Sequence, residues 1–182
     1  MIKYEVRSTI TKRESAARKA ADIIVMLLIC VVLLFILFWV MWRPVQIKGV
    51  SITGLNDGEL VIVDRVSKYL WSYDRGDILR ADTGMGYNEY RVVAMGGETL
   101  LVTDGKSYIN NAYLDEGAYN AVWESDVYLS ITVPNDSLLL LPDNRVGILT
   151  ESDLNSYIVK KGAVYGELRF RIYPISAITL FD

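Results

Sequence analysis

The sequence predicts a mainly β protein carried on a single N-terminal transmembrane helix, and two features of the chain indicate this. Ile23 to Trp42 form one run of twenty residues without a charged side chain. After residue 43, short β-branched and apolar stretches alternate with turns that contain glycine, asparagine or aspartate, the pattern of an antiparallel β domain. We therefore predict a compact antiparallel β domain over residues 43–182, preceded by a membrane anchor.

The apolar run has the length that a membrane-spanning helix needs. At about 1.5 Å per residue, twenty helical residues span about 30 Å, the thickness of the hydrocarbon core of a bilayer. Trp39 and Trp42 end the run, where tryptophan favours the membrane interface, and Arg43 and Pro44 follow in place of a small-residue cleavage site. We expect an uncleaved signal anchor over residues 22–42.

Charge distribution predicts the orientation of the anchor. Residues 1–21 carry six basic and two acidic side chains, and a basic flank favours the cytoplasmic side. We therefore expect a cytoplasmic basic arm over residues 1–21 and place residues 43–182 on the extracellular face of the cell membrane. That part has 13 basic and 19 acidic side chains, a net charge near −6, which argues against nucleic acid as a partner.

The β domain divides into segments that end at turn residues. The glycine pair at 96–97 and the Asp-Gly pair at 104–105 are typical of hairpins. One helical turn is expected within residues 150–158, where Thr150 or Ser152 can cap it. The predicted strands lie within residues 59–66, 76–81, 89–114, 126–133, 137–142 and 166–181.

The composition excludes most schemes of nucleophilic catalysis. The chain has no histidine, and its one cysteine, Cys30, lies in the apolar run. Ser–His and Cys–His catalysis are therefore excluded, and neither a disulfide, a metal site nor a cofactor is expected. A serine activated by a desolvated lysine remains. No lysine after the anchor lies within an apolar strand: these are Lys48, Lys68, Lys106, Lys160 and Lys161.

Seven short motifs occur in an order that carries a family resemblance. They are GVSITGLNDGELVIVDR at 49–65, RGDIL at 75–79, YRVVAMGGE at 90–98, DGKSYINN at 104–111, VPND at 133–136, PDNR at 142–145 and YGELRFRIYP at 165–174. In this order they resemble the type I signal peptidases, membrane-anchored serine–lysine proteases that remove signal peptides from exported proteins. The resemblance covers nearly the whole β domain and implies the antiparallel β fold of that family.

The resemblance places Tyr90 at the position of the general base. In the family a lysine directly precedes the Arg-Val-Val motif, which is intact here as Arg91, Val92 and Val93. A phenol has a pKa of about 10 and is a poor base at neutral pH. We expect Arg91 itself to pair with an acid such as Glu59 or Asp77.

The position of the family's nucleophilic serine has two alternatives in this chain. Counting forward from residues 47–49 places the serine at Ser51. Counting back from residues 57–59 places it at Val50, with Thr53 at the position of a family proline. The segment is one residue shorter than the family pattern, and both alignments stay open.

The polar cluster that supports the family's catalytic pair is also altered. The sequence VGILTESDL follows residue 145 in place of the family's serine- and aspartate-containing motif, and Asp153 does not have the matching spacing. Asp143, Asn144 and Arg145 remain from the preceding family motif. Base, nucleophile segment and supporting cluster are thus altered together, while the strand motifs are kept.

This combination predicts a non-catalytic relative, a pseudoenzyme whose inherited groove binds extended peptides by strand pairing. The groove is expected at edge strands that contain Val50, Ser51, Ile52, Tyr90, Arg91 and Val92. Proteins similar to signal peptidase that lack the catalytic pair occur in Gram-positive pilus loci, so the resemblance implies an accessory role in pilus assembly. The implied partners are the membrane and a pilin and sortase, or another exported protein.

Two alternatives stay open at this stage. One is an active signal peptidase, a serine endopeptidase in which Ser51 attacks with help from Lys48, Tyr90 or water. The other is a membrane-tethered β domain without a ligand groove that regulates another peptidase.

Overall fold

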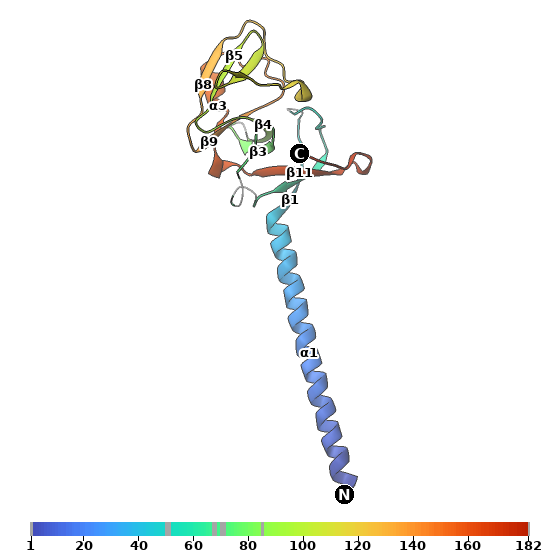
Figure 1. Cartoon of the computed structure of the whole chain (residues 1–182). Helices are drawn as coiled ribbons and strands as arrows, with labels where there is room; N and C mark the ends of the chain where they lie inside the picture. The colour runs from blue at the N-terminus through green and yellow to red at the C-terminus, as the bar shows by residue number, and fades with distance from the viewer. Residues whose placement is uncertain (1, 50–51, 67–68, 70–71, 85, 182) are drawn as a thin grey trace. The chain divides into compact units, whose positions relative to one another are not determined.

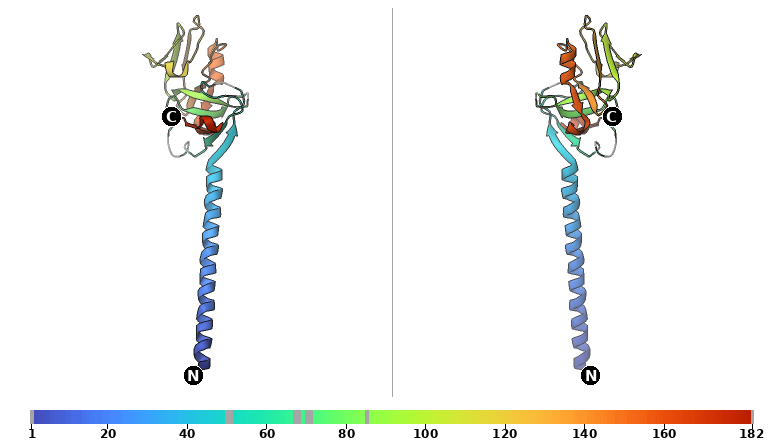
Figure 2. Two further views of the ribbon diagram at one scale, coloured as in Figure 1. Left: turned by 90° about the vertical axis from the view of Figure 1, so that its right-hand side faces the viewer. Right: turned by 90° about the vertical axis from the view of Figure 1, so that its left-hand side faces the viewer.

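The chain folds into two compact units, residues 1–41 and residues 42–182. The computed structural model describes residues 2–49, 52–66, 69, 72–84 and 86–181. The first unit is the helix α1, Ile2–Met41, which Figure 2 shows as one continuous helix. Its segment Arg18–Met41 is long and apolar enough to cross a membrane, and its side chains are exposed. Since leucine, isoleucine and valine dominate this segment, the exposure fits a helix in contact with lipid.

The second unit is built on a large antiparallel sheet (Figure 1). Its strands follow the order β1-β2-β11-β3-β4-β9-β10, and β12 pairs with β11. The chain therefore returns late, as β11, to lie between β2 and β3. The strands are β1 Trp42–Gln46, β2 Leu60–Asp64, β3 Ile78–Asp82, β4 Tyr87–Met95, β9 Ser137–Leu141, β10 Ile158–Lys160, β11 Gly166–Tyr173 and β12 Thr179–Leu180.

A smaller antiparallel sheet is inserted between β4 and β9 in the sequence. Its order is β7-β6-β5-β8, so β7 and β8 are its edges among the described strands (Figure 1). The strands are β5 Thr99–Thr103, β6 Lys106–Ile109, β7 Ala112–Tyr113 and β8 Leu129–Thr132. The helical segments whose bounds are described in the second unit are η1 Gly117–Tyr119, α3 Glu151–Ser156, η2 Lys161–Ala163 and η3 Ile175–Ala177.

The prediction of a mainly β protein with one N-terminal apolar helix is confirmed. Alternating burial in β2 and β5 follows the period of two of a half-buried strand. The Asp-Gly pair at 104–105 forms the turn between β5 and β6, with both residues at positive φ, the backbone that two-residue hairpins need.

The predicted helical turn is α3, and Thr150 is its N-cap. The Thr150 side chain accepts a hydrogen bond from the backbone N–H of Asp153, and the Asp153 carboxylate accepts one from the N–H of Thr150. These reciprocal bonds form a capping box. Of the two residues that the sequence offered as caps, the structure selects Thr150.

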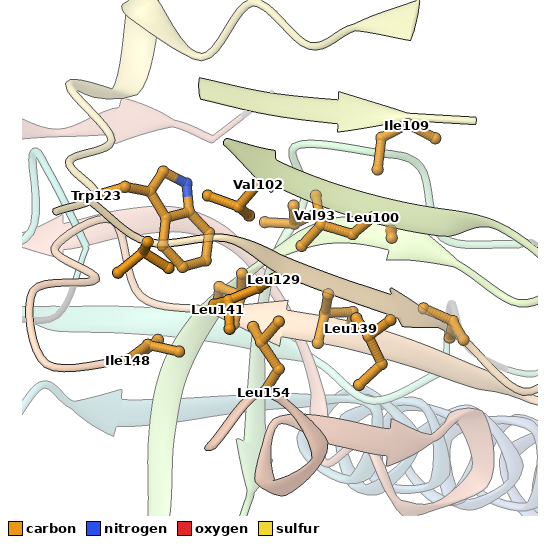
Figure 3. Packing of buried hydrophobic residues seen from close by; sticks show 14 residues of the cluster. Val93, Leu100, Val102, Ile109, Trp123, Leu129, Leu139, Leu141, Ile148 and Leu154 are labelled. Carbon is orange, nitrogen blue, oxygen red and sulfur yellow. The ribbon is translucent and has the colours of Figure 1, made fainter. Parts of the chain in front are cut away.

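The core of the second unit lies on both sides of β4 and β9. On one side, β4 and β9 pack against the smaller sheet and against Leu154 of α3 (Figure 3). On the other side, Tyr90 and Val92 of β4 pack with Leu138 and Leu140 of β9. β4, which contains the predicted site residues Tyr90, Arg91 and Val92, is therefore one of the two central strands.

Candidate functional site

The two predicted nucleophile positions, Val50 and Ser51, lie outside the described residues. The residues before and after this pair are held in place by hydrogen bonds near the end of β1 and the start of β2. The N–H of Ile47 donates to the carbonyl of Glu59 at 2.8 Å, and the N–H of Gly49 donates to the Asp57 carboxylate at 2.8 Å. Ile52 is only 1% exposed and packs in the core with Ile47. The segment from Ile47 to Glu59, called the 47–59 loop below, is thus held closed at its base.

Tyr90, which the order of motifs predicts at the position of the family's general base, is a core residue. Its side chain is 3% exposed and packs with Leu79 and Val92. Its hydroxyl shares a hydrogen bond of 2.9 Å with the Thr83 hydroxyl, and its ring meets the ring of Tyr157 edge-on, with centroids 5.8 Å apart. The contacts of the Tyr90 phenol with Thr83 and Tyr157 are therefore structural.

The structure corrects the expectation of an edge strand for Arg91 and Val92, but not for Tyr90. β4 pairs with β3 from Tyr87 to Arg91, and β9 covers its other side from Arg91 onward. All three side chains are buried, although Arg91 and Val92 also line a cavity of about 200 Å³. Sequence reasoning missed this because a strand's place in a sheet depends on pairing with distant segments. From Tyr87 to Tyr90, β3 is the one partner strand among those described.

Arg91 forms a buried ion pair with Asp143. Its Nε donates to Oδ1 of Asp143 at 2.9 Å and its Nη2 donates to Oδ2 at 3.0 Å, while its Nη1 donates to the carbonyl of Gly76 at 3.0 Å. The expected pairing with Glu59 or Asp77 is therefore wrong. Glu59 instead accepts hydrogen bonds from Arg171 at 2.7 and 2.8 Å and from Asn56 at 2.8 Å.

The same carboxylate holds the 47–59 loop. The backbone N–H of Thr53 donates to Oδ2 of Asp143 at 2.7 Å, and the Thr53 hydroxyl donates to the carbonyl of Tyr119 at 2.8 Å. The Tyr119 ring covers Arg91, whose guanidinium carbon lies 3.8 Å from the ring centroid. Thr53 and Tyr119 were not predicted as site residues, and no local sequence pattern distinguishes them. Together these residues link Thr53 of the 47–59 loop to Arg91 of β4.

Asn144 and Arg145, the other residues kept from the family motif, have structural contacts. The Asn144 side chain accepts from the N–H of Val146 at 3.2 Å within an exposed turn. Arg145 is fully buried, and its two terminal nitrogens each donate to a carboxylate oxygen of Glu116 at 2.7 Å. Ser107 also donates to Glu116, at 2.7 Å. This network joins the smaller sheet to the end of β9.

The segment after Arg145 contains no polar support for catalysis. Ile148 is buried in the core. Asp153 is part of the α3 capping box, where hydrogen bonds from Thr150 and then from Leu149 hold the pKa of its carboxyl below the ordinary value. Asp153 therefore does not substitute for the missing aspartate of the family.

A second group of ionisable residues lies where β2, β3 and β11 meet. Burial, together with repulsion from Asp77 and Asp64, raises the pKa of Glu167 to about 7, although Arg169 lies 3.0 Å away and acts against this shift. Burial, followed by repulsion from Glu167, Asp64 and Asp77, also raises the pKa of Tyr73. The Tyr73 hydroxyl has no hydrogen-bond partner among the described residues. No group of acidic or cysteine side chains in the described part of the chain has a geometry that could hold a metal ion.

The described lysines of the second unit do not provide a desolvated base. Lys48, Lys106 and Lys160 are exposed and Lys161 is partly exposed; Lys68 lies outside the described residues. An ammonium in water keeps its proton at neutral pH. Among the described residues, the geometry around Arg91 and Asp143 can therefore hold a loop and a chain segment in place, but it offers no group that is suited to take a proton from a serine.

Fold and site together define a β protein of the signal-peptidase type with an N-terminal apolar helix. The profile of the family described as "Signal peptidase, peptidase S26" matches residues 20–157, so the chain belongs to that family. It is 26% identical to signal peptidase I U of Bacillus subtilis, over 85% of this chain and 83% of that protein. It is 23% identical to a protein called inactive signal peptidase IA of Staphylococcus aureus, over 87% and 94%.

A solved structure is also similar. The crystal structure of a signal peptidase I from Enterococcus faecalis V583 covers 53% of this chain and 97% of its own, at 24% identity and a TM-score of 0.42.

Proposed function

We propose that this chain is a membrane-anchored, non-catalytic member of its family that assists pilus assembly by binding an extended segment of a pilin or another exported protein. The observation that carries the proposal is Tyr90. At the place where the family has a lysine, this chain has a buried phenol bonded to Thr83 and packed on Tyr157. Removing one member of a catalytic unit typically lowers activity by several orders of magnitude.

The relative called inactive signal peptidase IA supports the view that this family includes members without activity. The strand framework is kept in this chain, and a framework without a catalytic base can still bind an extended peptide. The start of β4, from Tyr87 to Tyr90, is the segment along which an incoming strand would lie, because β9 pairs only from Arg91 onward. Main-chain hydrogen bonds would then provide affinity for peptides of varied sequence.

The anchor and its orientation belong to this proposal. The segment Arg18–Met41 would cross the membrane once, with residues 1–21 in the cytoplasm and the β domain on the extracellular face. Exported proteins emerge on that face, so a domain tethered there would meet pilins and a sortase without diffusing through solution.

The test combines binding with genetics. The full-length protein in non-ionic detergent is incubated with the purified pilin, and mass spectrometry checks whether the pilin stays intact; an unrelated secreted protein is the control. We expect the pilin to be retained and uncut. Cells lacking the gene are expected to lose pilin polymers, and both the wild type and Ser51→Ala should restore them. Normal polymers in those cells would contradict the accessory role.

An active signal peptidase is the second candidate, favoured by the similarity to signal peptidase I U of Bacillus subtilis. In that case Ser51 would be the nucleophile, and Ser51→Ala would fail to restore the function that the wild type restores. The same complementation experiment therefore separates the two functions.

A further inference from the structure

A cavity of about 370 Å³ opens on the smaller sheet and is not part of the site around Arg91 and Asp143. It is lined by residues 105–107, 113–114, 116–117 and 120–123. Its volume lies in the range of ligand-binding pockets, which is about 300–1,000 Å³. The second cavity, of about 200 Å³, adjoins Arg91 and shares the Leu114 and Glu116 lining with the first.

The floor of the larger cavity consists of polar groups that already form hydrogen bonds with one another. Both carboxylate oxygens of Glu116 accept hydrogen bonds from Arg145, and one of them also accepts from Ser107. The Ser107 hydroxyl accepts from the indole N–H of Trp123 at 2.9 Å. Since no buried donor or acceptor of this network needs a further partner, an occupant gains little from a charged or polar group at the floor.

The lining of the cavity is mixed, with Lys106 and Asn120 beside four large apolar side chains. Trp123 is buried, Leu114 is partly buried, and Tyr113 and Val122 are 59% and 51% exposed at the opening. The apolar part of the lining favours an apolar side chain as the occupant, because the occupant and the exposed Tyr113 and Val122 would both lose contact with water.

The surroundings of the cavity are acidic. The stretch from residue 104 to residue 126 contains five acids and a single base, Lys106. Glu116 is neutralised by Arg145, and the other four, Asp104, Asp115, Glu124 and Asp126, are exposed. The two ends of this stretch lie close together, since a side chain on Gly105 would come within 3.9 Å of the Cα of Ser125. The negative charge is therefore concentrated beside the opening and favours a cationic ligand.

Strand β7 lies at the mouth and is an edge of the smaller sheet. It pairs with β6, and both of its residues, Ala112 and Tyr113, are exposed. An edge strand beside an apolar cavity is a place where an extended peptide can pair its backbone and insert one side chain.

From these observations we infer that the cavity is a second binding site, specific for an extended basic peptide that inserts one large apolar side chain between Tyr113 and Trp123. Lysine or arginine residues on both sides of that side chain contact Asp104, Glu124 and their acidic neighbours. The site is separate from Ser51 and Tyr90, so it does not depend on whether the chain has peptidase activity.

The binding test uses the full-length protein in non-ionic detergent and fluorescence anisotropy of a labelled nine-residue peptide. The peptide has phenylalanine at its centre, two lysines on each side and serine elsewhere. One control peptide replaces the lysines with glutamates, and another replaces the phenylalanine with glycine. We expect saturable binding of the first peptide alone, with at least fivefold weaker binding of each control. Equal binding of either control, or no binding of the first peptide, would overturn the inference.

Two variants of the protein test the two parts of the site separately. Val122→Arg places a cation over the mouth and is expected to weaken binding at least tenfold, whereas Ile175→Arg, an exposed apolar residue of η3, is the matched control. Asp104→Asn with Glu124→Gln is expected to weaken binding threefold to tenfold, against Asp136→Asn with Glu151→Gln as control. Circular dichroism confirms folding, and a variant that folds and binds within twofold of its control would overturn the part of the site it tests.

Discussion

The guanidinium of Arg91 and the carboxylate of Asp143 form a two-point ion pair, at 2.9 and 3.0 Å, with both side chains buried. The pair joins the middle of β4 to the turn after β9. Through the third bond of Asp143, from the N–H of Thr53, it also holds the 47–59 loop. Asp143, which remains from a motif that resembles the family's, thus has a structural role in this chain.

We predict that Asp143→Ala destabilises the protein by about 3–5 kcal/mol, because it leaves the Arg91 charge buried without its partner. Urea unfolding of the full-length protein in detergent, followed by tryptophan fluorescence, measures this change. Asp136→Ala removes an exposed aspartate and is the control, with an expected change within about 0.5 kcal/mol. Equal effects of the two substitutions would show that the ion pair does not stabilise the fold.

Tyr90→Phe is predicted to cost about 1 kcal/mol, since it removes the hydrogen bond to Thr83 and keeps the ring contact with Tyr157. Tyr87 lies three residues before Tyr90 on β4 and is half-exposed. Tyr87→Phe is expected to change the free energy of unfolding by less than half as much as Tyr90→Phe. If Tyr90→Phe were neutral, the phenol would not be held by structural contacts, and it would be open to a role in binding or chemistry.

Thr150→Ala is predicted to destabilise by about 1 kcal/mol through loss of the N-cap of α3. Ser152→Ala, inside the same helix, is the matched control and is expected to be neutral within about 0.5 kcal/mol. Thermal unfolding of both variants distinguishes the two caps that the sequence allowed. A larger loss from the Ser152 substitution would reverse the assignment.

Glu167 is predicted to make stability depend on pH. Its folded-state pKa of about 7 lies above the ordinary value of 4.5, so the folded protein binds more protons than the unfolded chain between these values. The contribution of this group to the free energy of unfolding therefore falls as pH rises from about 4.5 to about 7 and stays low above that.

Glu167→Gln removes this dependence. The free energy of unfolding of the variant minus that of the wild type is expected to be higher at pH 8 than at pH 4, by up to about 3 kcal/mol. Urea unfolding at both pH values measures this difference. Glu124→Gln, at an exposed site, should give the same difference from wild type at both pH values. A difference for Glu167→Gln that does not change with pH would contradict the raised pKa.

Much of the fold could be predicted because its signals are local. Alternation of apolar and polar residues marks β2 and β5, the Asp-Gly pair at 104–105 marks the β5–β6 turn, and Thr150 precedes α3 at capping distance. The order of short motifs was sufficient to predict the family, and the profile match over residues 20–157 confirms it.

The parts that could not be predicted depend on contacts between distant residues. Arg91 and Asp143 are separated by 52 positions, and Arg145 and Glu116 by 29. The first pair depends on the register of β4 against β9, and the second on how the segment after the smaller sheet packs beside the turn after β9. No local sequence pattern encodes either arrangement. For the same reason the sequence placed Arg91 and Val92 on an edge strand, although β4 is an interior strand from Arg91 onward.

The central claim is the absence of peptidase activity, and one assay tests it most directly. The full-length protein in detergent is incubated with a signal-peptide-bearing substrate, in parallel with its Ser51→Ala variant and with an active signal peptidase I as positive control. We predict no cleavage by the wild type above the level of Ser51→Ala, while the positive control cuts the substrate. Cleavage at a defined bond by the wild type, lost in Ser51→Ala, would contradict the account.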